Sequence, residues 1–216
     1  KLEATVTSLL IGAFSVFFIA FFFLKEENLF TNMIVSVLPA EHENKIKDSI
    51  NEITKLLTRY FGGILIQITV ITIFVSFSLK IVGVQNALLI AFFAAIINVI
   101  PYVGPMIGAI FGIVLTMSTS IDLNMDFYAQ TLPLLGKVVV VFALMQALDN
   151  FILQPYIFSN SVNAHPLEVF IIILVGSQLA GIPGMVLAIP TYTVFRVIGK
   201  TFLSQFRVIQ SLTKSL

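Results

Sequence analysis

The stretch from Gln146 to Pro166, QALDNFILQPYIFSNSVNAHP, sets polar side chains inside an otherwise apolar part of the chain. Helical spacings of i, i+3, i+4 and i+8 put four of them on one face of a helix: Gln146, Asp149, Asn150 and Gln154. Polar side chains on one face of a membrane helix need partners. Pro155 then removes a backbone donor, and the SNSVNAHP that ends the stretch is typical of a turn. We therefore expect a polar helix that leads into a second membrane element.

The composition indicates an all-α integral membrane protein. Hydrophobic residues make up 58% of the 216 residues and charged residues only 11%. The mean hydropathy is +1.02, and uncharged windows approach the roughly 20 residues that a membrane-spanning helix needs. A soluble core cannot use that much apolar sequence. We expect a polytopic helical bundle that forms a single membrane domain over residues 1–216, surrounded by the lipid bilayer.

Charge and cysteine content exclude several other classes of protein. The net charge is only +1, and the basic residues fall in loops rather than in one patch, so we expect no nucleic-acid partner. The chain has no Cys, which excludes a disulfide framework, a thiolate nucleophile and a Cys-rich metal site. We expect neither a metal site nor a cofactor.

The N-terminal part is predicted to hold one membrane helix and one surface segment. Residues 4–24 are uncharged, long enough to span the bilayer, and without the cleavage pattern of a signal peptide. Because the first residue is Lys1 rather than Met, we interpret residues 1–24 as an internal helix of a longer chain. Residues 29–60 are expected to be a cytoplasmic or interfacial amphipathic segment, since apolar residues recur every three or four positions opposite a charged face. A separate span is expected from Phe61, where Gly62 would allow close helix packing.

Two similar units follow, over residues 61–121 and 138–195, and each combines one long helix with a hairpin broken by Gly and Pro. The breaks have these residues at their tips: Pro101, Gly104 and Pro105 in the first hairpin, and Gly181, Pro183 and Gly184 in the second. Each unit has three apolar runs, so two consecutive units must be inverted relative to each other, which is the plan of many secondary transporters. Ordinary Pro/Gly loops at the membrane surface are the alternative.

The short arms of these hairpins favour re-entrant segments. Arms of about 14 residues reach only about 21 Å as helix, whereas the hydrocarbon core is about 30 Å thick. We expect both tips to meet near the membrane midplane, with Asn98 and Gln178 facing the helix that carries Asp149. Backbone groups freed at such breaks are tolerated where they line a wet cavity, often around a substrate or an ion.

The distribution of basic residues predicts the orientation in the membrane. Nine of the twelve Lys and Arg residues fall within residues 25–59 or in the tail, residues 196–216. The positive-inside rule therefore places both segments, and the C-terminus, in the cytoplasm. Lys80 and Lys137 then lie on the far side.

Three segments resemble the signature segments of the autoinducer-2 exporter family of bacterial membrane transporters: INVIPYVGPMIG at 97–108, LDNFILQPYIFSNSVNAHPL at 148–167 and GIPGMVLAIP at 181–190. The resemblance covers essentially the whole chain in order and spacing. Family members are typically longer at the N-terminus, so the chain resembles the C-terminal two-thirds of one. It departs from many members at Gly63, where they carry a polar Gln or Lys.

The resemblance implies a transporter in the bacterial inner membrane that exports small molecules such as the quorum-sensing signal autoinducer-2. Some members of the family are described as sodium/proton antiporters. We accordingly expect a small-molecule substrate, H⁺ or Na⁺ as coupling ion, and assembly into a homo-oligomer.

Asp149 is the strongest candidate for an ion site. It is the only charged residue between Val138 and Asn163, and it falls roughly 17 Å along its helix from Val138. An intramembrane carboxylate is expensive and usually functional, so a coupling-ion or proton site is the first hypothesis and a structural carboxylate the second. The other five polar candidates could bind a hydroxylated substrate or join helices: Asn150, Gln146, Gln154, Asn98 and Gln178. For His165, capping of the next helix is favoured over a proton relay.

Two other classes of function compete with a transporter. An intramembrane enzyme would need an HExxH motif, a second deep carboxylate or a Ser paired with a membrane Lys or His, and none is found at a persuasive spacing. We therefore expect no enzymatic activity. A channel is the other alternative, because broken helices in an oligomer could line a pore.

Overall fold

The computed structural model describes residues 2–26, 29–37, 43–161 and 165–202, and every regular element within these ranges is helical. Five of the described helices are long and apolar enough to cross a membrane. The all-α, polytopic membrane fold predicted from the composition is therefore confirmed. The tail from residue 203 onward lies outside the described residues. The chain divides into two compact units, residues 1–52 and 53–216.

The first unit contains α1 (Leu2–Lys25), α2 (Leu29–Val37) and the first turns of α3. α1 covers the predicted N-terminal span and is long and apolar enough to cross a membrane. Its side chains whose burial is described are all exposed, including a row of contacting rings at Phe14, Phe18 and Phe22. Such a surface is suited to lipid, where an α-helix satisfies its own backbone hydrogen bonds.

The helix α3 (Glu43–Val82) runs without interruption for 40 residues. The predicted surface helix and the span predicted from residue 61 therefore form one continuous helix. Two Gly residues cost only about 1 kcal/mol each relative to Ala inside a helix. At Gly63 the cost is offset by packing, because an added Cβ would lie 2.9 Å from a side-chain carbon of Ile157.

The first hairpin consists of α4 (Ala87–Ile97) and α5 (Val103–Asp122). Its arms are unequal, contrary to the prediction of two short arms. The 11 residues of α4 reach only about 16 Å, whereas the 20 residues of α5 reach about 30 Å, the thickness of the hydrocarbon core. The turn between them confirms the predicted break. It contains Asn98, which ends α4, and Tyr102, whose φ is 66°.

The next long helix contains two wide π-helical turns. The first, η2 (Phe127–Thr131), precedes α6 (Leu132–Leu148), and the second, η3 (Asp149–Leu153), precedes α7 (Gln154–Ser161). The helix continues through Pro155 to Ser161, so the first three residues of SNSVNAHP, predicted to form a turn, are helical. A Pro ring collides with the carbonyl four residues earlier in a regular α-helix, and the π turn just before Pro155 is the kind of local widening that accommodates such a clash.

The second hairpin is α8 (Pro166–Phe202), which folds back on itself at Ala180 and Gly181. Gly181 has φ 61° and ψ −138°, a conformation essentially reserved for Gly, so the predicted break at this residue is confirmed. The hydroxyl of Tyr192 donates to Glu168 Oε2 at 2.6 Å and joins the two arms. His165 Nδ1 accepts a hydrogen bond from the backbone N–H of Leu167 at 3.2 Å, as expected for a cap.

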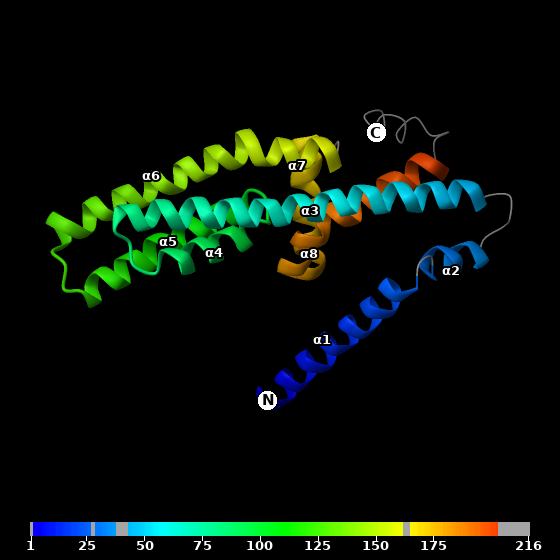
Figure 1. Cartoon of the computed structure of the whole chain (residues 1–216), viewed down its shortest axis with the longest axis horizontal. Coiled ribbons are helices and arrows are strands. Elements are labelled where there is room, and N and C mark those ends of the chain that lie inside the picture. The colour runs from blue at the N-terminus through cyan, green and yellow to red at the C-terminus, as the bar shows by residue number, and fades with distance from the viewer. Residues whose placement is uncertain (1, 27–28, 38–42, 162–164, 203–216) are drawn as a thin grey trace. The chain divides into compact units, whose positions relative to one another are not determined.

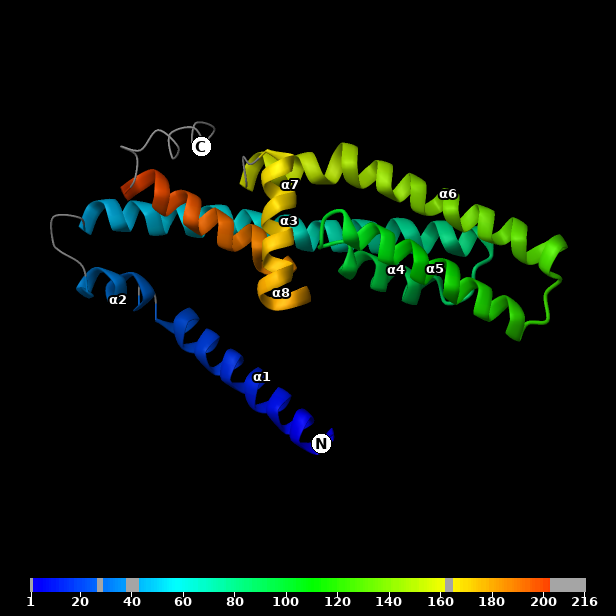
Figure 2. The ribbon, with the colours of Figure 1, turned by 180° about the vertical axis from the view of Figure 1, so that it is seen from behind.

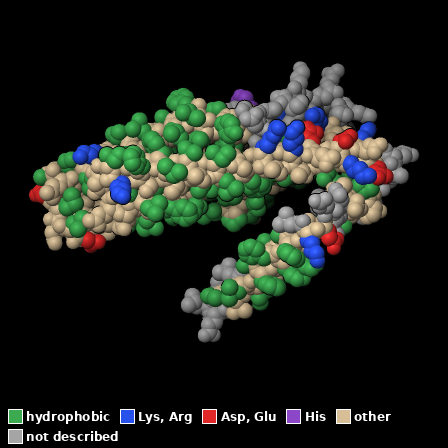
Figure 3. Space-filling model, in the orientation of Figure 1, with side chains coloured by type: hydrophobic (Ala, Val, Ile, Leu, Met, Phe, Trp, Pro, Cys, Tyr) green, Lys and Arg blue, Asp and Glu red, His purple; other side chains and the backbone are tan. Residues whose placement is uncertain are grey.

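Two apolar cores hold the second unit together. The first core joins the C-terminal half of α3 to α4 and α6, around side chains such as Ile71, Ile90 and Val138. Both views show α3, α5 and α6 running alongside one another (Figures 1 and 2). The second core joins Tyr60 of α3 and Ile157 of α7 to the arms of α8. Hydrophobic side chains also cover much of the outer surface of the helices (Figure 3), as expected in lipid.

The order of elements supports the predicted repeat. Residues 61–121 contain a long helix followed by the α4–α5 hairpin, and residues 138–195 contain a long helix followed by the α8 hairpin. The inverted relation between the two units stays a prediction.

Candidate functional site

A buried carboxylate surrounded by amides lies between the two apolar cores. Asp149 is 0% exposed. Its Oδ1 accepts a hydrogen bond from Gln67 Nε2 at 2.7 Å. Its Oδ2 accepts two, from Asn98 Nδ2 at 3.1 Å and from Gln154 Nε2 at 2.9 Å. We call these four residues the Asp149 cluster.

Each member of the Asp149 cluster is positioned by a different feature of the backbone. Gln67 lies on the buried face of α3, one turn before Ile71. Asn98 ends α4 at the tip of the first hairpin, where its backbone N–H donates to the carbonyl of Ala94. The hairpin therefore ends at the carboxylate, because its helix stops after only 11 residues.

The π turn η3 brings Gln154 to Asp149. In it the backbone N–H of Gln154 donates to the carbonyl of Asp149, five residues earlier. Side chains five residues apart do not face each other on a regular α-helix, where three and four are the neighbouring spacings. The wider turn lets the Gln154 amide reach back to the carboxylate. Such π turns are frequent at functional sites.

The carboxylate has no cationic partner among the described residues, since none of their Lys, Arg or His side chains forms an ion pair with Asp149. Burying an ion costs several kcal/mol. Hydrogen bonds to charged groups contribute about 1.5–3 kcal/mol each, so three of them offset a cost of that order. All three are accepted by the carboxyl group, and all three donors are neutral side-chain amides.

A second polar row continues along the same helix. Gln146 Nε2 donates to Asn150 Oδ1 at 2.8 Å, and Gln154 Nε2 approaches the same oxygen at 3.3 Å. Gln154 thereby connects this row to Asp149. The four polar residues predicted to share a helical face are indeed linked, although Asp149 points inward and Asn150 is exposed.

Two cavities adjoin these residues. One of about 10 Å³ touches Gln67, Asn98 and Gln154, and this volume suits a single water molecule or small ion. The other, of about 300 Å³, lies between α5 and α6 from Pro105 to Gln146. Its size falls within the range of small-molecule sites. Gln146 Oε1 is buried and has no hydrogen-bond partner among the described residues.

Pro101 lines the smaller of these cavities and Pro105 the larger, whereas Gln178 and the tip of the second hairpin line neither. Gln178 is exposed on α8 and takes part in none of the hydrogen bonds of the Asp149 cluster. The predicted meeting of the two hairpin tips is also not what the structure shows. The ring of Tyr102, at the first tip, stacks edge-on against Phe170 with centroids 5.7 Å apart. Phe170 lies on the first arm of α8, well before Gly181, and Ile182 at the second tip is exposed.

Gln67 was missed by the sequence analysis. It is a lone amide in the apolar segment ILIQITV of α3. The signal that could have found it is the same one that singled out Asp149, a polar side chain isolated inside a membrane span. Its partner lies 82 positions away, which no local pattern reveals.

Replacing Gln67 with Leu should destabilise the protein by about 1–3 kcal/mol, because one oxygen of a buried carboxylate loses its donor. Thermal unfolding in detergent measures this loss. Gln178→Leu is the matched control, since Gln178 is exposed on α8 and forms none of the hydrogen bonds of the Asp149 cluster. A loss for Gln67→Leu no larger than for the control would contradict the described hydrogen bond.

Comparison with known proteins gives one family. A family model described as "AI-2E family transporter" matches residues 1–204. Two Bacillus subtilis (strain 168) proteins are similar. "Putative transport protein YueF" is 29% identical over 205 residues, which is 95% of this chain and 52% of YueF. "Putative transport protein YrrI" is 27% identical over 186 residues, 86% of this chain and 50% of YrrI.

A third relative, "Putative transport protein MT0215" of Mycobacterium tuberculosis, is 28% identical over 195 residues, 89% of this chain and 50% of its own length. The chain thus spans about half the length of these relatives. No solved structure matches it.

Proposed function

Because the chain belongs to the AI-2E transporter family, we propose that it is a secondary transporter that exports a small polar molecule such as autoinducer-2, driven by a proton or sodium gradient. The family and the five apolar helices make it a multi-pass membrane transport protein. The cargo, the driving cation and the direction of transport are the proposal.

The observation that carries the proposal is the burial of the Asp149 carboxyl group among neutral partners. A carboxylate with 0% exposure and only neutral donors around it is a site to which a cation would be drawn. Asn98 Oδ1, the other end of an amide already bonded to Asp149, is buried and unpartnered among the described residues. Turning that amide over would present a second oxygen beside the carboxylate, and hard cations such as Na⁺ take oxygen ligands.

The position of the substrate is proposed from the second polar row. The cavity of about 300 Å³ ends at Gln146, and the row through Asn150 and Gln154 leads from there to Asp149. A hydroxyl of the cargo would satisfy the unpaired oxygen of Gln146. Cation and cargo would then bind at neighbouring sites, and export driven by an inward cation gradient would require that they bind alternately rather than together.

The alternative functions predict different fluxes. A sodium/proton antiporter would use Asp149 for both cations and need no organic cargo, and exchange of the two ions without autoinducer-2 would favour it. A channel would show flux that rises linearly with concentration. We propose no enzymatic activity, in line with the transport proteins to which the chain is similar.

The proposed orientation places residues 29–60 and the C-terminus in the cytoplasm of a bacterial inner membrane. Because the chain has no Cys, single Cys residues at the exposed positions Asn51 and Tyr128 can be labelled without background. An impermeant thiol reagent should label Asn51→Cys from the cytoplasmic side only and Tyr128→Cys from the opposite side only. Labelling of both from one side would contradict the orientation.

Assembly into a homo-oligomer is part of the proposal as well. Large apolar side chains stay exposed along α5 and α6, and a second copy could cover part of that surface. Mass measurement of the detergent-solubilised protein tests it, and a monomeric mass would oppose it.

A further inference from the structure

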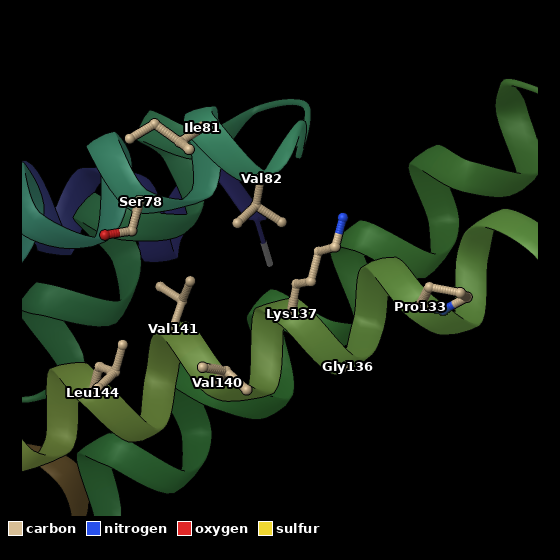
Figure 4. Close-up of a pocket in the computed structure, with 9 residues that line it drawn as sticks. All are labelled: Ser78, Ile81, Val82, Pro133, Gly136, Lys137, Val140, Val141 and Leu144. Carbon is tan, nitrogen blue, oxygen red and sulfur yellow. The ribbon is translucent and has the colours of Figure 1, made fainter.

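A groove separate from the Asp149 cluster lies where α3 ends and α6 begins. Its volume is about 520 Å³, and none of the residues that line it belongs to the Asp149 cluster. Seven of its nine lining residues carry no polar side chain, and the other two are Ser78 and Lys137. Figure 4 shows the Lys137 side chain extending from α6 toward Val82, while Ser78 and Leu144 lie at the opposite end.

The polarity of this groove changes along the helix axis. Its Lys137 end lies beside Val82, the last residue of α3, at the edge of the apolar segment. Its other end runs down Val140 and Leu144, deeper into the same segment. The groove thus has a charged end at the helix terminus and an apolar end toward the middle of the membrane. A phospholipid has the same polarity, because its head lies at the interface and its acyl chain points inward.

The charge of Lys137 is available to a ligand. Among the described residues no carboxylate forms an ion pair with it. Lys80 precedes the lining residue Ile81 but does not itself line the groove. Asp122 and Asp126 do not line the groove.

We propose that this groove binds one anionic phospholipid, with its phosphate at Lys137 and an acyl chain between α3 and α6. Basic pockets between membrane helices bind anionic headgroups, and each Lys near the surface contributes about 1 kcal/mol, or about fivefold in affinity. The apolar lining holds the chain, and Lys137 selects the headgroup.

A fluorescence experiment tests this site directly. The chain has no Trp, so Phe77→Trp, an exposed position beside Ser78, provides a reporter without background. The full chain with this reporter is reconstituted in phosphatidylcholine vesicles that contain increasing amounts of phosphatidylglycerol with brominated acyl chains. Quenching should reach its midpoint at about fivefold less brominated phosphatidylglycerol than brominated phosphatidylcholine.

Three variants distinguish lipid binding in the groove from attraction of lipid to surface charge in general. Lys137→Gln should abolish the preference for phosphatidylglycerol, whereas Lys80→Gln, outside the groove lining, should leave most of it. Gly136→Leu should also abolish the preference, because a side chain added at Gly136 meets no other atom within 4 Å and fills the groove while Lys137 stays. Equal quenching by both lipids, or a preference that survives Lys137→Gln or Gly136→Leu, would overturn the proposal.

Discussion

Asp149→Asn is expected to abolish cation-driven transport, down to the level of protein-free vesicles, while the helical bundle stays assembled. The substitution removes the charge that would attract the cation and keeps the size of the side chain. The new amide donates where the carboxylate accepted, but Asn98 and Gln154 can turn their own amides over to accept from it. Folding should therefore tolerate the change, with a loss of about 1–3 kcal/mol at most.

Flux assays and thermal unfolding of the same preparations test this expectation together. Asp122→Asn is the matched control, since Asp122 is exposed at the end of α5. The control should transport like the unmodified chain. Transport by Asp149→Asn with an unchanged dependence on pH and sodium would make Asp149 a structural carboxylate only.

Gly104→Ala is expected to disrupt the tip of the first hairpin and to impair transport strongly. A Cβ at this position would meet the carbonyl oxygen of Ile97 and would lie 2.7 Å from the Cα of Asn98. Both are backbone atoms, which cannot move aside as a flexible side chain can. Overpacking of this kind costs about 1–3 kcal/mol. Relief of the clash would also move Asn98 away from Asp149, whose Oδ2 lies 3.1 Å from Asn98 Nδ2.

The control for this prediction is Gly136→Ala. Gly136 also lies in a helix, but an added Cβ there meets nothing within 4 Å, so the higher helix propensity of Ala should stabilise the protein by up to about 1 kcal/mol. The unfolding midpoint should therefore fall for Gly104→Ala and stay the same or rise for Gly136→Ala. The transport rate should fall only for Gly104→Ala. Equal behaviour of the two variants would mean that the tip is not packed as described.

The sequence predicted those features of the fold that depend on local patterns. Long uncharged runs identify spans such as α1, and a Gly that needs φ 61° marks the fold in α8 at Gly181. The continuity of α3 through Gly62 was not predicted, because Gly propensity is weak compared with the packing of a 40-residue helix. The unequal arms of the first hairpin depend on where α4 ends against Asp149, and this is a tertiary contact.

The residues of the candidate site, like the features of the fold, could be predicted only in part. Asp149, Gln154 and Asn98 were identified because polar side chains are rare in membrane spans. Gln67 and Gln178 carry the same signal, yet only Gln67 is buried against Asp149. The sequence pattern does not show which isolated amide faces a neighbouring helix and which faces lipid. The π turn at Asp149 was not predicted either, because the sequence does not show how the helix backbone will accommodate the clash at Pro155.

The flux of autoinducer-2 under imposed gradients shows whether a cation drives transport. Proteoliposomes that contain the unmodified chain are loaded with labelled autoinducer-2, and efflux is measured with a sodium gradient, a proton gradient or neither. Efflux should saturate with autoinducer-2 concentration and accelerate under one of the two gradients. Efflux that rises linearly with autoinducer-2 concentration and does not respond to either gradient would contradict cation-driven transport.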